Sequence, residues 1–172
     1  MNHTSFARTL VAALFFFPAW CDTGLMPLNE PAGISGVIRF KNWPPADSVR
    51  ELRLVAFETY PNDSLGILAA LLGGRAAVYP ELSVSGGLPK FVDALNYSWT
   101  TKQGVNLQLK KYDYFVVAQQ YGPNILSDWR PAGVYSTVPN SFEPAPVRLL
   151  LHRILPNIDI QVDFHNPPPK PW

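Results

Sequence analysis

The 172-residue chain has a single cysteine, so it can form neither an intramolecular disulfide nor a metal site built from several thiolates. Charge is also scarce: 14 lysines and arginines stand against 13 acidic residues, and charged residues make up 16% of the chain. Nucleic-acid binding needs clustered basic residues, so the sequence argues against a nucleic-acid partner. Low charge combined with 13% aromatic residues also argues against disorder. A single folded domain is expected.

Motifs for catalysis and metal binding are missing as well. The chain has no Gly-x-Ser-x-Gly nucleophile elbow and no glycine-rich loop directly before a helical segment. His152 and His165 have no cysteine or histidine at ligand spacing. Asp159 and Asp163 are four residues apart on a predicted strand, about 13 Å, which is too far for one ion. We therefore expect no metal, no cofactor and no enzymatic activity.

The N-terminal residues have the pattern of a secretory signal peptide. Arg8 precedes an apolar run over residues 10–20, and the first acidic residue is Asp22. A membrane-spanning helix needs about 20 apolar residues, and Pro18 ends this run too soon. An amphipathic first helix of the domain is the alternative, but residues 10–17 contain no polar stripe. The sequence predicts a signal peptide over residues 1–20 and export of the rest.

Cys21 follows this apolar run directly. Its position resembles that of the lipidation cysteine of bacterial lipoproteins, and the whole chain resembles the uncharacterised small lipoproteins of diderm bacteria. The resemblance implies cleavage before Cys21, acylation of its thiol, and a lipid anchor at the periplasmic or outer-membrane surface. Ordinary cleavage nearby, which leaves a soluble protein with a free thiol, is the alternative. Residues 21–33 lack periodicity and are expected to be a tether.

The mature chain has mostly period-two hydrophobic patterns, which are typical of β-strands. Two such segments are residues 34–40 and residues 158–164, where Ile158, Ile160, Val162 and Phe164 are expected to face inward. Further strands are predicted at 51–57, 95–100, 105–110, 112–121, 133–138 and 147–152. With no repeated crossover helices, the sequence predicts an all-β fold, an antiparallel β-sandwich of about seven or eight strands over residues 34–165. The proline-rich tail, residues 166–172, is expected to be extended.

One short helical insertion is predicted between residues 61 and 80. Asp63 and Ser64 offer an N-cap, and leucines follow at helical spacing. These leucines are Leu65, Leu68, Leu71 and Leu72. Gly73 and Gly74 then end the helix, because glycine readily adopts the left-handed conformation found after helix C-termini.

Three segments of the mature chain resemble transthyretin-like or carboxypeptidase-regulatory-like domains. They are Gly-Val-Ile-Arg-Phe at residues 36–40, Leu-Gln-Leu-Lys-Lys-Tyr-Asp-Tyr-Phe-Val-Val-Ala at residues 107–118, and the closing strand at 158–164. Such domains commonly begin with a Gly-x-Ile strand and carry Leu-x-x-Leu-x-x-Gly-x-Tyr before a central strand. Asp113 stands where that family prefers glycine, and residues 61–90 are an insertion relative to it. The resemblance implies a β-sandwich and brings no activity with it.

The segment from residue 121 to residue 133 is longer than an ordinary hairpin loop and is the candidate ligand-binding loop. Trp129 could offer an aromatic platform for a sugar, flanked by Asp128, Arg130 and Tyr121. Alternatively, Trp129 closes one end of the core while Asp128 and Arg130 tie the loop together. We expect a non-enzymatic binding or assembly module, whose partner is an envelope protein. A carbohydrate-binding or carbohydrate-handling protein that recognises a surface glycan through this loop is the alternative.

Overall fold

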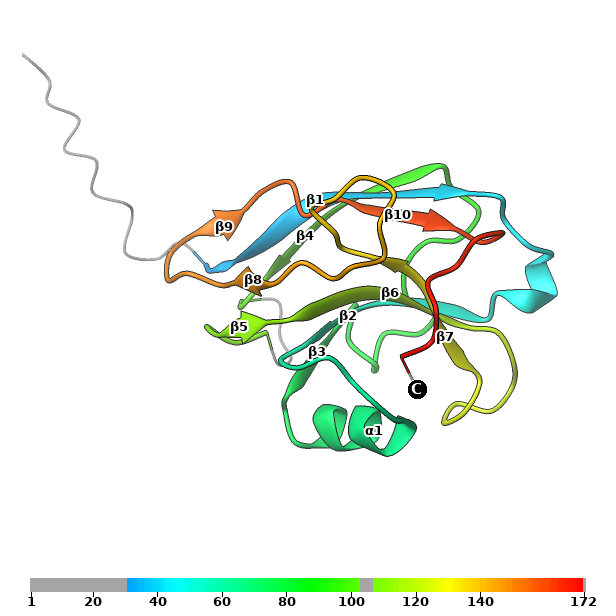
Figure 1. The fold of residues 1–172 in the computed structure, drawn as a ribbon, viewed down its shortest axis with the longest axis horizontal. Helices are drawn as coiled ribbons and strands as arrows, with labels where there is room; N and C mark the ends of the chain where they lie inside the picture. Colours follow the sequence, from blue (N-terminus) through cyan, green and yellow to red (C-terminus); the bar gives the residue numbers. More distant parts are fainter. Residues whose placement is uncertain (1–30, 103–106, 172) are drawn as a thin grey trace, which may run out of the picture.

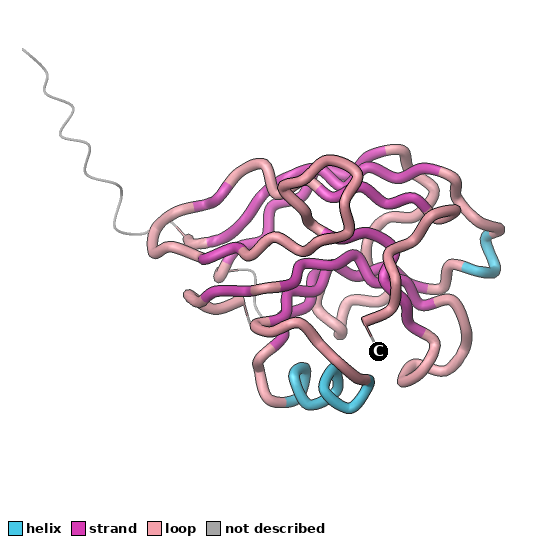
Figure 2. Tube along the Cα trace, in the orientation of Figure 1, coloured by secondary structure: helices cyan, strands magenta, loops and turns pink. Residues whose placement is uncertain are grey.

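The computed structural model describes residues 31–102 and 107–171, and these residues form a β-rich fold with one α-helix (Figures 1 and 2). The elements are β1 (Gly33–Lys41), the 3-10 helix η1 (Ala46–Ser48), β2 (Glu51–Phe57), α1 (Ser64–Leu72), β3 (Ala76–Tyr79), β4 (Ala94–Thr100), β5 (Lys111–Tyr112), β6 (Tyr114–Gln120), β7 (Trp129–Val134), β8 (Val147–Arg148), β9 (Ile154–Leu155) and β10 (Ile160–Asp163). The all-β expectation is confirmed. The predicted signal peptide and Cys21 lie outside the described residues.

The strands form two larger sheets and one small pair. Sheet A has the order β10-β1-β4, with β9 also paired to β1; sheet B has the order β3-β2-β6-β7; β5 pairs with β8. Strands β9 and β10 run parallel to β1, so the expectation of purely antiparallel pairing is wrong for sheet A. Parallel neighbours need a long crossover, and here the chain that builds sheet B serves as that crossover.

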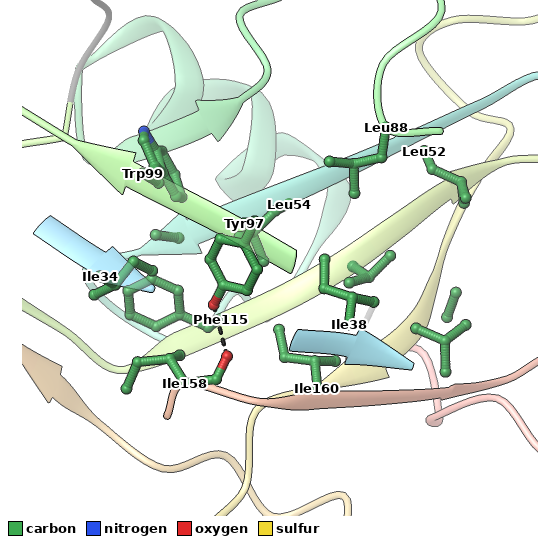
Figure 3. Close-up of a cluster of buried hydrophobic side chains, with 14 of the residues drawn as sticks. Ile34, Ile38, Leu52, Leu54, Leu88, Tyr97, Trp99, Phe115, Ile158 and Ile160 are labelled. Carbon is green, nitrogen blue, oxygen red and sulfur yellow. Dashed lines mark hydrogen bonds between the residues drawn. The ribbon is translucent and has the colours of Figure 1, made fainter. Parts of the chain in front are cut away.

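One buried cluster joins the inner faces of both sheets (Figure 3). Ile34 and Ile38 contribute to it from sheet A, and Leu54 and Phe115 contribute from sheet B. Tyr97 of β4 is also buried there, and its hydroxyl donates to the backbone oxygen of Ile158 at 2.7 Å. Burial raises the pKa of Tyr97, and the nearby charge of Asp159 adds to the shift. The hydroxyl therefore stays protonated as a donor that ties β4 to the chain entering β10.

The two sheets meet closely along the side where β7 faces β10. A Cβ atom added at Gly133 of β7 would lie 2.4 Å from the backbone oxygen of Gln161. The same holds within sheet A, where a Cβ added at Gly36 of β1 would lie 2.3 Å from the backbone oxygen of Ile158, just before β10. Both values are shorter than any normal contact, so both positions need glycine for the backbones to approach.

The closing strand follows its predicted pattern: Ile158, Ile160, Val162 and Phe164 are all buried. The intervening carboxylates contact the neighbouring strand. Asp159 accepts from the amide of Val37 at 2.9 Å and from Arg39 at 3.2 Å. Asp163 accepts from the Asn42 amide at 2.8 Å, and this hydrogen bond lowers the pKa of the Asp163 carboxyl. These carboxylates therefore hold β10 beside β1.

Several predicted boundaries are wrong. The described part of the predicted strand at 105–110 is a turn, in which the Lys110 amide donates to the oxygen of Gln108 at 2.8 Å. The predicted strand at 147–152 is limited to β8, because the chain turns at His152, whose φ is 54°. Strand β3 lies inside the predicted helical insertion. Strand β7 begins at Trp129, so the candidate loop covers only residues 121–128.

Candidate binding groove

Helix α1 matches its prediction in extent and in both ends. The Asp63 carboxylate caps the helix by accepting from the amide of Gly66 at 2.5 Å. The helix ends before Gly73, and Gly74 has a φ of +67°, which glycine adopts without steric cost. The cap and the glycine pair therefore account for the two ends of α1.

The side chains that α1 packs against the sheet are only partly buried and differ from the expected leucine face. Ile67, Ala70 and Leu71 pack against the outer face of sheet B. Leu65 and Leu72 are 79% and 81% exposed. The helix therefore covers the sheet with one narrow stripe and leaves apolar side chains on its flanks uncovered.

An apolar groove of about 340 Å³ lies between α1, the outer face of sheet B and the loop that precedes β7. Strands β2, β3, β6 and β7 contribute lining residues from the sheet. Helix α1 and the loop that precedes β7 both lie at the lower side of the molecule in Figure 1. The lining residues are Arg53, Val55, Phe57, Ser64, Leu65, Ile67, Leu68, Leu71, Val78, Leu82, Val116, Ala118, Ile125, Leu126, Ser127, Trp129, Arg130 and Pro131. The volume falls within the range of about 300–1,000 Å³ that is typical of ligand pockets.

The loop over residues 121–128 forms the second wall of the groove and is held by its own hydrogen bonds. The Asn124 side-chain oxygen accepts from the amide of Leu126 at 2.9 Å. The two carboxylate oxygens of Asp128 accept from the amide of Asn124 at 2.8 Å and from the Ser127 hydroxyl at 2.9 Å. These hydrogen bonds hold the loop backbone in place. Ile125 and Leu126 are exposed on its surface.

The four residues predicted to bind a ligand lie close together, and each makes different contacts. Trp129 lines the groove, and its indole nitrogen donates to the backbone oxygen of Ile125 at 2.9 Å. The Arg130 Nε donates to the Gln119 side-chain oxygen at 2.9 Å, and its guanidinium lies 5.8 Å from the Tyr121 ring centre. Asp128 is therefore engaged by the loop itself, and Arg130 by Gln119 of β6.

Arg53 of β2 is the buried charge in the groove lining, with 2% exposure. Its Nη1 donates to the backbone oxygens of Pro80 at 2.7 Å and Glu81 at 2.6 Å. Its Nη2 donates to the oxygen of Val84 at 2.6 Å and pairs with the carboxylate of Glu51. The guanidinium therefore fastens the segment after β3 onto sheet B.

The sequence patterns do not predict that α1 lines a groove or that Arg53 is buried. One signal was present: α1 reads Ser-Leu-Gly-Ile-Leu-Ala-Ala-Leu-Leu and is apolar on almost every face. A helix that is apolar all round needs more than one apolar contact. One stripe of α1 meets sheet B, and the remaining apolar side chains of the helix are left exposed.

Within residues 31–102 and 107–171, no three His, Cys, Asp or Glu side chains gather to hold a metal ion. Nor does this part of the chain contain a helix whose length and hydropathy would let it span a membrane. Comparison of the chain with protein-family models gives no match, and searches of the curated proteins and of the solved structures give none either.

Proposed function

We propose that this chain is an exported, lipid-anchored envelope protein whose mature part is a β-sandwich acting as a non-enzymatic binding module. The observation that carries the proposal is the apolar groove between α1, sheet B and the loop at 121–128. The core shared by sheets A and B supports the sandwich. The signal-like residues 1–20 and the position of Cys21 support export and anchoring.

The exposed apolar side chains of the groove favour binding over a purely structural role. Leu65, Leu82, Ile125 and Leu126 are all largely exposed and converge on one cavity. Covering apolar surface gains roughly 25 cal/mol per Å², so a ligand that fills the groove is favoured without any catalytic group. A standard protein interface buries about 800 Å² on each partner, which is more than this groove offers. The groove thus suits a small apolar molecule of the envelope.

Replacing Leu65 with glutamate is expected to weaken binding of the neutral dye Nile red by about tenfold or more, because the variant places a carboxylate on an apolar wall. Fluorescence titration measures the affinity. The matched control is Leu72→Glu, since Leu72 is equally exposed on the same helix and does not line the groove. Equal affinities of the two variants would place dye binding elsewhere.

Carbohydrate binding is the second candidate, and the accessible rings of Trp129 and Tyr121 favour it. The Asp128 carboxylate oxygens already accept hydrogen bonds inside the loop, which leaves less polar recognition for a sugar. The test is retention of the protein on polysaccharide. If Trp129→Ala abolishes retention while the fold and Nile red binding persist, carbohydrate binding is favoured over the apolar ligand.

The lipid anchor predicts a specific mass. When the full chain is expressed in a diderm bacterium, the mature protein is expected to begin at Cys21 and to carry acyl mass, with loss of that mass in Cys21→Ser. Intact-mass spectrometry of the membrane fraction makes the comparison. Cleavage at another site, with an unmodified thiol, would indicate a soluble exported protein instead of a lipid-anchored one.

A further inference from the structure

Strand β4 forms one edge of sheet A, and among the described strands it pairs only with β1. Directly before β4, the amide of Phe40 donates to the oxygen of Asp93 at 2.8 Å, and the pairing continues in the same register along the strand. The backbone groups of successive residues in a strand point to alternate sides, so the odd-numbered residues of β4 bond to β1. The N–H and C=O groups of Asn96 and Ser98 therefore point away from β1, at the open edge.

The side chains of β4 divide between the core and the solvent. Tyr97 and Trp99 are buried in the core shared by the two sheets (Figure 3), whereas Asn96 and Ser98 are exposed. The strand is seven residues long and contains no proline, no glycine and no charged residue. Nothing in its sequence therefore hinders pairing with a further strand.

The other edge strands of the two larger sheets have features that discourage pairing. Strand β10 is four residues long and contains Asp163. Strand β3 is also four residues long and is followed directly by Pro80, and β7 contains Pro131. Natural sheets protect their edges with short strands, prolines and charges, because an open edge is a template for another strand. Strand β4 has none of these features and is the edge that another strand can extend.

The charges at the two ends of β4 favour a second copy of the same strand. Asp93 precedes the strand, Lys102 follows it, and both residues are exposed. When two copies of β4 pair antiparallel over their full length, Asp93 of each copy lies at the end where Lys102 of the other copy lies. Parallel pairing would place the like charges together instead.

We propose that two copies of this chain associate through antiparallel pairing of β4 with β4, so that sheet A continues from one copy into the other. With full overlap, Tyr97 lies opposite Tyr97 at the two-fold axis, and Asn96 of each copy lies opposite Ser98 of the other. The outward N–H and C=O groups of these two residues then bond across the interface. The groove lies on the outer face of sheet B, so this self-association goes beyond the proposed ligand binding and is independent of it.

Sedimentation velocity of the full chain in a non-ionic detergent tests the proposal, and the parent chain is expected to be a dimer. Combining Asn96→Lys with Ser98→Lys places like charges directly opposite one another across the interface. This double variant is expected to raise the dimer dissociation constant by about tenfold or more. Its circular dichroism spectrum is expected to match that of the parent chain, because both side chains are exposed.

The matched control places opposite charges at the same two positions. In Asn96→Glu combined with Ser98→Lys, each new carboxylate faces a new ammonium group of the other copy. The dissociation constant is therefore expected to stay within about threefold of the parent value. Equal weakening by both double variants, or weakening by neither, would overturn the pairing of β4 with β4. A monomeric parent chain would overturn self-association and leave this edge to an extended segment of another protein.

Discussion

Arg53→Met is expected to lower the free energy of unfolding by about 3–5 kcal/mol, which is the cost of removing one partner of a buried ion pair. Methionine has a similar length and no donors, so Glu51 loses its charge partner and the oxygens of Pro80, Glu81 and Val84 lose their hydrogen bonds. Urea denaturation followed by circular dichroism measures the change.

Arg39→Met provides the comparison for this loss. Arg39 pairs with Asp159 at 3.2 Å, but both side chains are well exposed to solvent. Exposed pairs contribute about 1 kcal/mol or less, so Arg39→Met is expected to be nearly neutral. A similar small loss in both variants would show that the segment after β3 does not depend on Arg53.

The local sequence patterns of the chain predict several elements of the fold. The closing strand at 158–164 alternates strictly, and the structure buries all four residues predicted to face inward. Helix α1 has its predicted cap at Asp63 and ends at the predicted glycines. Both features depend on neighbours within a few residues, which the sequence displays directly.

The parts that sequence patterns missed depend on contacts between distant segments. The parallel pairing of β1 with β10 joins residues about 120 positions apart and leaves no local trace. Strand β3 is four residues long, and Ala76 and Ala77 within it are not strong strand formers. The pairing of β3 with β2 through Val55 and Val78 supplies what local propensity does not.

The groove was missed for the same reason. Its walls come from α1, from the segment after β3, from the loop at 121–128 and from the outer face of sheet B. Trp129 is a predicted site residue, and the groove that it lines is mostly apolar, with Leu65 and Leu126 also in the lining. Arg53 reads in the sequence as the outward member of an alternating strand. Its burial follows only once residues 80–84 fold over it.

Phe115→Ala is expected to lower the free energy of unfolding by about 3–5 kcal/mol, as for other fully buried phenylalanines. The ring belongs to β6 of sheet B and lies in the same buried cluster as Ile34 and Ile38 of sheet A (Figure 3). It also meets the Tyr112 ring edge-on at 5.7 Å between centres. Loss of the ring would therefore remove contacts with both sheets at once. The melting temperature is expected to fall by on the order of 10 °C.

Phe142→Ala is the control for this prediction, because Phe142 is 39% exposed and lies outside the shared core. The residue after Phe115, Val116, faces the opposite side of sheet B and lines the groove. Phe115→Ala should therefore leave Nile red affinity unchanged at temperatures where the variant is folded, although its melting temperature falls. Equal stability of the two phenylalanine variants would contradict a core shared by the two sheets, and with it the proposed sandwich. Loss of dye binding in folded Phe115→Ala would mean instead that the groove depends on the inner packing of β6.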